Sequence, residues 1–178
     1  MIAITGHTHG IGQEVLARLG SDALGFSTNN GYDITSQPSR RAIIDAVKHC
    51  DVFINNAQAG WGQVDLLIEL FQEWREQPKL IVNVGSRIAE ITLPAKRLHL
   101  LQYSAQKKAL KTTVAELQGY DCRVEYVWFA YVGTERILAK YPHFTAADYI
   151  PVSAAADIIM QPVVDYLSLK GSGLVPGS

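Results

Sequence analysis

The sequence predicts an α/β protein with a doubly wound parallel sheet of about six strands, and three observations support this fold class. Short apolar runs alternate with stretches of helical periodicity throughout the chain, which is typical of right-handed βαβ units. Apolar runs such as 79–84 lack a period-two alternation, as expected for strands that helices cover on both faces. A glycine-rich turn follows the first apolar run and precedes a helical stretch.

The expected elements follow from these patterns in chain order. The strands are predicted at Ile2–Thr5, Ala23–Ser27, Val52–Asn55, Leu80–Val84 and Val124–Phe129. The helices are predicted at Gly12–Leu19, Ser39–His49, Val64–Glu76, Leu98–Gln118 and Ser153–Leu167. After the second strand, residues 26–35 leave no room for a crossover helix, so we expect a loop with at most an edge strand near Tyr32–Ile34. Pro162 should kink or shorten the last helix.

One domain is expected, because 178 residues can bury a sizeable core and no linker, repeat or low-complexity tract divides the chain. It is expected to span residues 1–170. Residues 171–178 resemble a linker and protease-site remnant of an expression vector, so they are left out of the fold argument.

Composition and charge restrict the classes of partner. The chain is 48% hydrophobic and 19% charged, with a formal net charge of −1, which indicates neither nucleic acid nor an anionic membrane as a partner. No apolar run approaches the roughly 20 residues that span a bilayer, and no signal-peptide pattern is present, so a cytoplasmic protein is expected. Cys50 and Cys122 lack metal-ligand or redox spacing; we expect them reduced in the interior, and no metal site is predicted.

The stretch Thr5-Gly6-His7-Thr8-His9-Gly10-Ile11-Gly12 connects the first strand to the first helix. Such a turn presents backbone amides and the positive end of the helix dipole to a bound anion. Glycine suits it because glycine tolerates positive φ and lets a phosphate approach the backbone. A purely structural glycine turn is the alternative interpretation.

Three further motifs map to the same region of the expected fold. Asn55-Asn56-Ala57 ends one strand, Ser86 ends the next, and Tyr103-Ser104-Ala105-Gln106-Lys107 lies on a long helix. In an open α/β sheet, ligands bind outside the carboxyl ends of the strands, where Thr5, Asn55 and Ser86 fall. Together with the glycine turn, this set resembles the short-chain dehydrogenase/reductase family over nearly the whole chain, and the resemblance implies a Rossmann-type sheet.

Tyr103 and Lys107 stand at i and i+4, so they share one helical face. A free tyrosine has a pKa of about 10, and a nearby ammonium lowers it toward the working range of a base. The resemblance implies that Tyr103 is the acid/base, that Lys107 also hydrogen-bonds the nicotinamide ribose, and that Ser86 holds the substrate oxygen. A surface pair and a simple turn serine are the alternatives.

The resemblance also implies a nicotinamide cofactor, with NADP favoured over NAD. Ser27 and Thr28 follow the second strand, where no carboxylate grips the ribose hydroxyls or repels a 2′-phosphate. His9 sits where NADP-using relatives often place a basic residue, and Asp33 resembles the family residue that contacts adenine, unless it is an exposed turn residue. The implied cofactor-binding residues are Gly6, His7, Thr8, His9, Gly10, Ile11, Gly12, Ser27, Thr28, Asp33, Ile34, Asn56, Ala57, Val132 and Thr134.

Four departures from the family pattern stand out. No asparagine lies on the helix before the Ser86 strand, so the family's water-mediated proton relay must be absent or rebuilt. Phe129-Ala130 replaces the usual Pro-Gly, although Val132 and Thr134 keep their places beside the cofactor. The substrate loop Glu135–Pro151 is short, and its aromatic residues form either a small lid or part of the core. The usual seventh strand is expected to be missing.

These observations predict an oxidoreductase that transfers a hydride between a nicotinamide cofactor and a small carbonyl or alcohol substrate. The missing asparagine and short loop favour an alternative, a non-catalytic dinucleotide-binding sensor or scaffold of the same fold. A homodimer or higher homo-oligomer is also expected, through a four-helix interface. The apolar residues assigned to it, unless the core uses them, are Leu66, Leu67, Leu70, Phe71, Trp74, Leu98, Leu101, Ala105, Ala109 and Val114.

Overall fold

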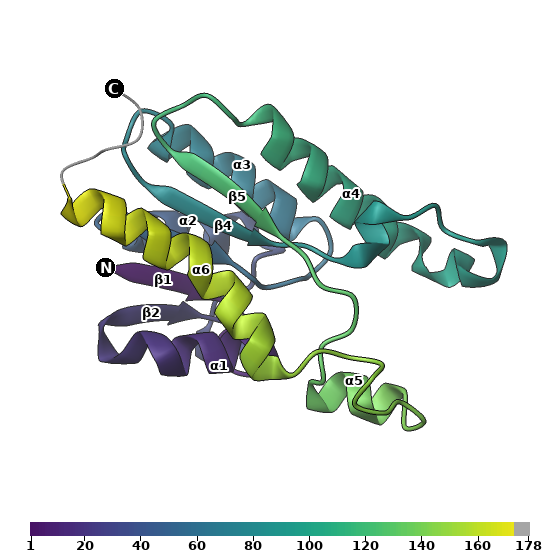
Figure 1. The fold of residues 1–178 in the computed structure, drawn as a ribbon. Helices are drawn as coiled ribbons and strands as arrows, with labels where there is room; N and C mark the ends of the chain where they lie inside the picture. The colour runs from purple at the N-terminus through teal and green to yellow at the C-terminus, as the bar shows by residue number, and fades with distance from the viewer. Residues whose placement is uncertain (173–178) are drawn as a thin grey trace.

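A parallel five-stranded sheet forms the centre of the computed structural model, which describes residues 1–172 (Figure 1). Its strands are β1 (Ile2–Thr5), β2 (Ala23–Phe26), β3 (Val52–Asn55), β4 (Leu80–Val84) and β5 (Arg123–Val127). They lie in the order β2-β1-β3-β4-β5, and every neighbouring pair is parallel. The strand order reverses beside β1, which is where a doubly wound sheet opens a ligand site.

Helices cover both faces of this sheet, which confirms the doubly wound class (Figure 1). The α-helices are α1 (Gly10–Leu19), α2 (Gln37–Ala46), α3 (Gly62–Trp74), α4 (Leu101–Glu116), α5 (Glu135–Lys140) and α6 (Val152–Gly171). Short 3-10 turns are η1 (Gly20–Asp22), η2 (Thr28–Asn30), η3 (Arg87–Glu90) and η4 (Ala95–Leu100). One core cluster joins the sheet to α2, α3 and α4, and the other joins it to α1 and α6.

Residues Tyr32–Ile34 form the expected loop without an edge strand, and the sheet of the described chain has five strands where about six were expected. The segment turns instead, because the Asp33 carboxylate accepts hydrogen bonds from the backbone N–H and the hydroxyl of Thr35 at 2.9 and 2.8 Å. The N–H of Ser36 also donates to the Asp33 carbonyl at 3.0 Å. Side-chain capture of the backbone by aspartate is a known competitor of strand pairing.

Of the two expected effects of Pro162, a kink or a shorter helix, the shortening does not occur, since α6 continues through this residue to Gly171. Its buried side chains, such as Ile159, Val163 and Tyr166, pack on the sheet before and after the proline. The Tyr166 hydroxyl donates a hydrogen bond to the Pro78 carbonyl, which ties the second half of α6 to the start of β4. Tertiary packing therefore outweighs the lost backbone hydrogen bond.

Most of the apolar residues considered for an interface belong to the core. Leu66, Leu67 and Leu70 of α3 are completely buried, and Phe71 and Trp74 are at most 5% exposed. In contrast, Leu98 in η4 and Leu101 at the start of α4 are 60% and 58% exposed. In the part of the chain that the structure describes, no helix has the length and apolar character needed to cross a membrane. Residues 173–178 of the expected vector remnant lie outside the described residues.

Candidate functional site at the carboxyl edge of the sheet

The glycine turn and the Asn-Asn-Ala motif form one hydrogen-bonded unit at the carboxyl ends of β1 and β3. The buried Thr5 hydroxyl accepts hydrogen bonds from the backbone N–H groups of Asn56 and Ala57 at 3.1 and 3.0 Å. In return, the Asn56 side-chain amide donates to the carbonyls of Thr5 and Gly6 at 3.1 and 3.3 Å. The two motifs are 50 residues apart in sequence, and these bonds set their relative position.

Glycine is required in this turn for two different reasons. Gly6 and Gly10 have φ of 70° and 55°, a conformation that other residues rarely adopt. A Cβ atom on Gly12 would lie 2.1 Å from the Gly6 carbonyl oxygen, so the first turn of α1 packs directly on the turn before it. Because α1 starts at Gly10 without a side-chain cap, its first backbone N–H groups are available at this edge. Ile11 packs against the core cluster on the α1 and α6 face.

The histidines of the turn have different surroundings. His7 packs its ring on Gly25 of β2, where a Cβ atom would lie 2.6–2.8 Å from three ring atoms. His9 is exposed, and its Nδ1 lies 2.9 Å from the Thr8 hydroxyl. His9 is therefore the solvent-exposed histidine of the turn.

The segment after β2 is polar and carries no carboxylate up to residue 32. Ser27 is 9% exposed, and its N–H donates to the Asn30 side chain at 2.7 Å. Thr28 is exposed at the start of η2. Asp33 is exposed, and hydrogen bonds from Thr35 lower the pKa of its carboxyl.

Thr134 approaches the turn from a distant part of the chain. A Cβ atom on Gly10 would lie 2.9 Å from the Thr134 methyl group, and the Thr134 hydroxyl caps α5 by accepting from the N–H of Ile137 at 3.4 Å. Val132 is 6% exposed and pairs with Ile150 in an isolated parallel bridge. The structure thus brings Thr134 next to the glycine turn.

Ser86, Tyr103 and Lys107 gather where β4 ends and α4 passes over it. Ser86 follows β4 by two residues, and its hydroxyl accepts from the Ile88 N–H at 3.4 Å to cap η3. Tyr103 is half-buried, and the Lys107 Nζ lies 5.9 Å from the centre of its ring. Lys107 is 3% exposed and donates a hydrogen bond to the Val84 carbonyl at 2.9 Å. The helical spacing of Tyr103 and Lys107 therefore places both against the end of the serine strand.

Several solved structures with a similar fold are dehydrogenases or reductases. A short chain dehydrogenase from Burkholderia cenocepacia J2315 in complex with NADP matches with a TM-score of 0.70 at 18% identity, over 97% of this chain and 94% of that one. A variant actinorhodin polyketide ketoreductase with NADPH matches with a TM-score of 0.69 at 19% identity, over 92% of each chain. A short chain dehydrogenase/reductase from Burkholderia phymatum in complex with NAD matches with a TM-score of 0.68 at 16% identity, over 93% of this chain and 86% of that one.

This chain has the fold of the short-chain dehydrogenases. At 16–19% identity the likeness is one of fold, and the residues at the sheet edge are what can indicate a function. No protein-family model matches the sequence, and no curated protein is significantly similar to it.

Within this short-chain dehydrogenase fold, sequence reasoning missed Gln63. It lies in the first turn of α3, is 1% exposed, and its Oε1 accepts a hydrogen bond from the Lys107 Nζ at 2.7 Å. Its side-chain Nε2 donates to the carbonyls of Asn55 and Val84 at 2.8 and 3.0 Å. The family pattern has an asparagine on this helix, and Gln63 carries the same amide group on a side chain one methylene longer. A glutamine early in the helix is therefore the sequence signal that points to this residue.

Asn55 extends this buried polar network into the sheet. Its side-chain amide donates to the Gln63 carbonyl at 2.9 Å and to the Asn83 Oδ1 at 3.0 Å. Asn83 in turn donates to the Glu125 carbonyl at 3.3 Å. Two neighbouring strands and a helix are therefore joined by completely buried amides, which are costly unless paired.

Burial controls the charge of Lys107. Desolvation lowers the pKa of its ammonium from 10.5 to about 7. Its polar partners are a side-chain amide and a backbone carbonyl, and no ion pair to it is formed within residues 1–172. A lysine with a pKa in this range exchanges protons readily at neutral pH.

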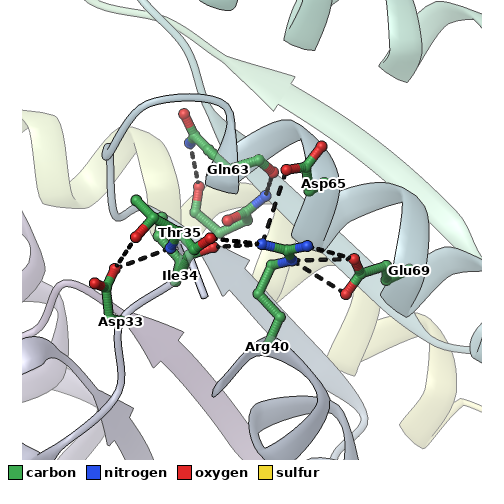
Figure 2. A network of polar contacts seen from close by, with 8 residues as sticks. Asp33, Ile34, Thr35, Arg40, Gln63, Asp65 and Glu69 are labelled. Atoms are coloured by element: carbon green, nitrogen blue, oxygen red, sulfur yellow. Dashed lines mark hydrogen bonds and ion pairs between the residues drawn. The ribbon is translucent and has the colours of Figure 1, made fainter. Parts of the chain in front are cut away.

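A second polar network holds the 33–35 loop against α3 (Figure 2). The Arg40 guanidinium, 7% exposed, pairs with Glu69 at 2.7 Å and donates to the carbonyls of Ile34 and Thr35 at 3.0 and 3.3 Å. Ile34 is 4% exposed beneath it. Arg40 was not predicted from the sequence, and it positions the segment that carries the expected adenine contact.

The aromatic residues of the short loop pack on one another. Tyr141 stacks on Phe144 with ring centres 4.8 Å apart, and both contact Tyr131 edge-on. Tyr149 covers Gly133, where a Cβ atom would lie 2.4 Å from its ring. Tyr131, Tyr141 and Phe144 belong to neither of the two core clusters.

Proposed function

We propose that the chain is a member of the short-chain dehydrogenase/reductase family, an oxidoreductase that uses a nicotinamide cofactor. The substrate class is a small carbonyl or alcohol. The proposal is supported most by the buried Lys107, whose Nζ lies 5.9 Å from the centre of the Tyr103 ring and donates to the carbonyl of Val84, two residues before Ser86. A structural lysine has no need to be desolvated beside a tyrosine one helical turn away.

A nicotinamide dinucleotide fits the turn, because free amides at the start of α1 and the close-packed Gly6, Gly10 and Gly12 suit a pyrophosphate. When bound, it supplies or accepts the hydride. In the proposed reaction Tyr103 donates a proton to the carbonyl oxygen during reduction and removes it during oxidation. Ser86 hydrogen-bonds the same oxygen, and the Lys107 ammonium favours the phenolate form of Tyr103.

NADP is proposed in preference to NAD. Ser27, Thr28 and the exposed His9 offer hydrogen-bond donors near a 2′-phosphate, and no carboxylate follows β2 to repel it. The relatives of this fold crystallised with NADP, NADPH and NAD, so both cofactors belong in the test. Fluorescence titration should give the lower Kd for NADPH; tighter binding of NADH would reverse the preference.

The experiment for the function is turnover of a panel of aldehydes, ketones and quinones with NADPH, comparing wild type with Tyr103→Phe. Wild type should oxidise NADPH with at least one of them, and Tyr103→Phe should bind NADPH normally but lose about 100-fold or more in rate. Tight NADPH binding without turnover of any substrate would instead indicate the alternative, a dinucleotide sensor or scaffold.

We also propose a homodimer, as the family resemblance implies. Most apolar residues of α3 are buried in the core. The exposed apolar residues proposed for the interface are Ile68, Leu98 and Leu101, which are 39–60% exposed. Sedimentation velocity of wild type and Leu98→Ser/Leu101→Ser tests it. A wild-type monomer at micromolar concentration would exclude the dimer.

A further inference from the structure

We propose that Gln63 is a positioning residue that holds the Lys107 ammonium directly and ties it to the ends of β3 and β4. The inference rests on the proposed function for its catalytic meaning. Its structural part rests on the hydrogen bonds between α3, α4 and the sheet alone.

The orientation of the Gln63 amide follows from its partners. The two atoms facing Nε2 are the carbonyl oxygens of Asn55 and Val84, at 2.8 and 3.0 Å, and carbonyl oxygens only accept hydrogen bonds. The group facing Oε1 is the Lys107 ammonium at 2.7 Å, which only donates when protonated. A flipped amide would place donor against donor and acceptor against acceptor, so only one orientation satisfies all three contacts.

Val84 closes the arrangement into a ring. Its carbonyl accepts from both the Gln63 amide and the Lys107 ammonium, at 3.0 and 2.9 Å. Lys107 therefore has two of its three donors directed at fixed acceptors, and one donor remains for a group entering from the site. Because Ser86 lies two residues beyond Val84, the same carbonyl also relates the lysine to the serine strand.

A direct amide contact behaves differently from a water relay. An amide side chain does not ionise, so Gln63 orients the ammonium without passing its proton onward toward the sheet. A proton exchanged by Lys107 then does not pass through Gln63, and the Tyr103 ring centre lies 5.9 Å from the same Nζ. In place of the family's water relay at the missing asparagine, the Gln63 Oε1 accepts a hydrogen bond directly from the Lys107 Nζ.

The carboxylates near Lys107 form ion pairs with other side chains. The carboxylates on elements packed against α4 are ion-paired: Asp65 and Glu69 with Arg40, Glu73 with Arg41, Glu90 with Lys111, and Glu125 with Arg123. The phenols on this side are Tyr103 and the half-buried Tyr126, and the exposed basic side chains of η3 and η4 are Arg87, Lys96, Arg97 and His99. Gln63 is accordingly the side chain that Lys107 hydrogen-bonds within the described chain.

The test is an NMR titration of the Lys107 side-chain carbon next to Nζ, assigned by its loss in Lys107→Met. Wild type should titrate near pH 7. Gln63→Leu removes an acceptor of the charged form and should lower the midpoint by about one to two pH units. Gln63→Glu, nearly the same shape, should raise it, and exposed Gln72→Leu on the same helix should leave it unchanged.

A midpoint that is the same in Gln63→Leu and wild type would overturn the proposal. If Gln63→Leu does not fold, Gln63→Glu carries the test, and an unchanged midpoint there overturns it as well. The titration needs no substrate, so a chain without turnover would defeat the proposed function and leave this result standing.

Where turnover is found, the pH profile separates positioning from a merely structural role. Gln63→Leu should lose about tenfold in kcat at pH 8 and recover as the pH falls to where Lys107 is protonated again. An equal loss at every pH would indicate general destabilisation and would contradict the positioning role.

Discussion

Arg40 and Arg41 offer a matched test of how the 33–35 loop is held, because each pairs with a glutamate of α3, one turn apart. The Arg40 side chain is 8% exposed and that of Glu69 29%, whereas Arg41 and Glu73 are 58% and 44% exposed. Arg40 also donates to the carbonyls of Ile34 and Thr35. The two arginines therefore differ in burial and in the number of groups that they satisfy.

The expected magnitudes differ accordingly. Hydrogen bonds to charged groups contribute about 1.5–3 kcal/mol, and breaking a fully buried pair costs about 3–5 kcal/mol. Since Glu69 is partly exposed and can be solvated, Arg40→Met should lower the free energy of unfolding by about 2–4 kcal/mol. Arg41→Met removes a solvent-exposed pair and should leave the free energy of unfolding close to that of wild type.

Urea unfolding of both variants in one buffer measures this difference, and thermal unfolding should show a Tm lowered by roughly 6–12 °C for Arg40→Met. Affinity for NADPH should fall with Arg40→Met and stay unchanged with Arg41→Met, because Asp33 and Ile34 lose their support. Equal stability losses in the two variants would refute the reasoning from burial.

Two further predictions follow from the site. Burial lowers the pKa of Lys107 below its value in the unfolded chain, so the unfolded chain binds more protons between about pH 7 and 10.5. The free energy of unfolding should therefore rise with pH in this range by up to about 1.4 kcal/mol per pH unit. Urea unfolding from pH 6.5 to 9 should show this rise in wild type and not in Lys107→Met, and parallel curves for the two proteins would disprove it. In Gly12→Ala the new methyl group would meet the Gly6 carbonyl at 2.1 Å, so NADPH affinity should fall by at least about tenfold while Gly171→Ala, where a Cβ atom meets open space, matches wild type.

Local patterns were sufficient for the framework of this protein. The apolar runs at 2–5, 52–55 and 80–84 lie in buried strands, and the helical stretches beside them became α1 to α4 and α6. These features follow from periodicity and from glycine and proline chemistry, which act over a few residues.

Side-chain contacts explain the two places where the local pattern left the outcome open or pointed the other way. At Tyr32–Ile34 the Asp33 side chain captured the backbone, although the pattern allowed a strand. At Pro162 the packing of Ile159 and Val163 on the sheet maintained a helix that the local rule would end. In each case the deciding energy is a side-chain contact that residue spacing does not record.

By itself, the sequence determined the α/β class, the glycine turn at the first strand end, and the order of the Asn55, Ser86, Tyr103 and Lys107 motifs. Only the tertiary structure decided what holds the lysine and the adenine loop. Gln63 meets Lys107 from 44 residues away, and Arg40 meets Glu69 from 29 residues away. Such pairs form because chain folding brings separate helices to one sheet edge, where buried polar groups must find partners or destabilise the fold.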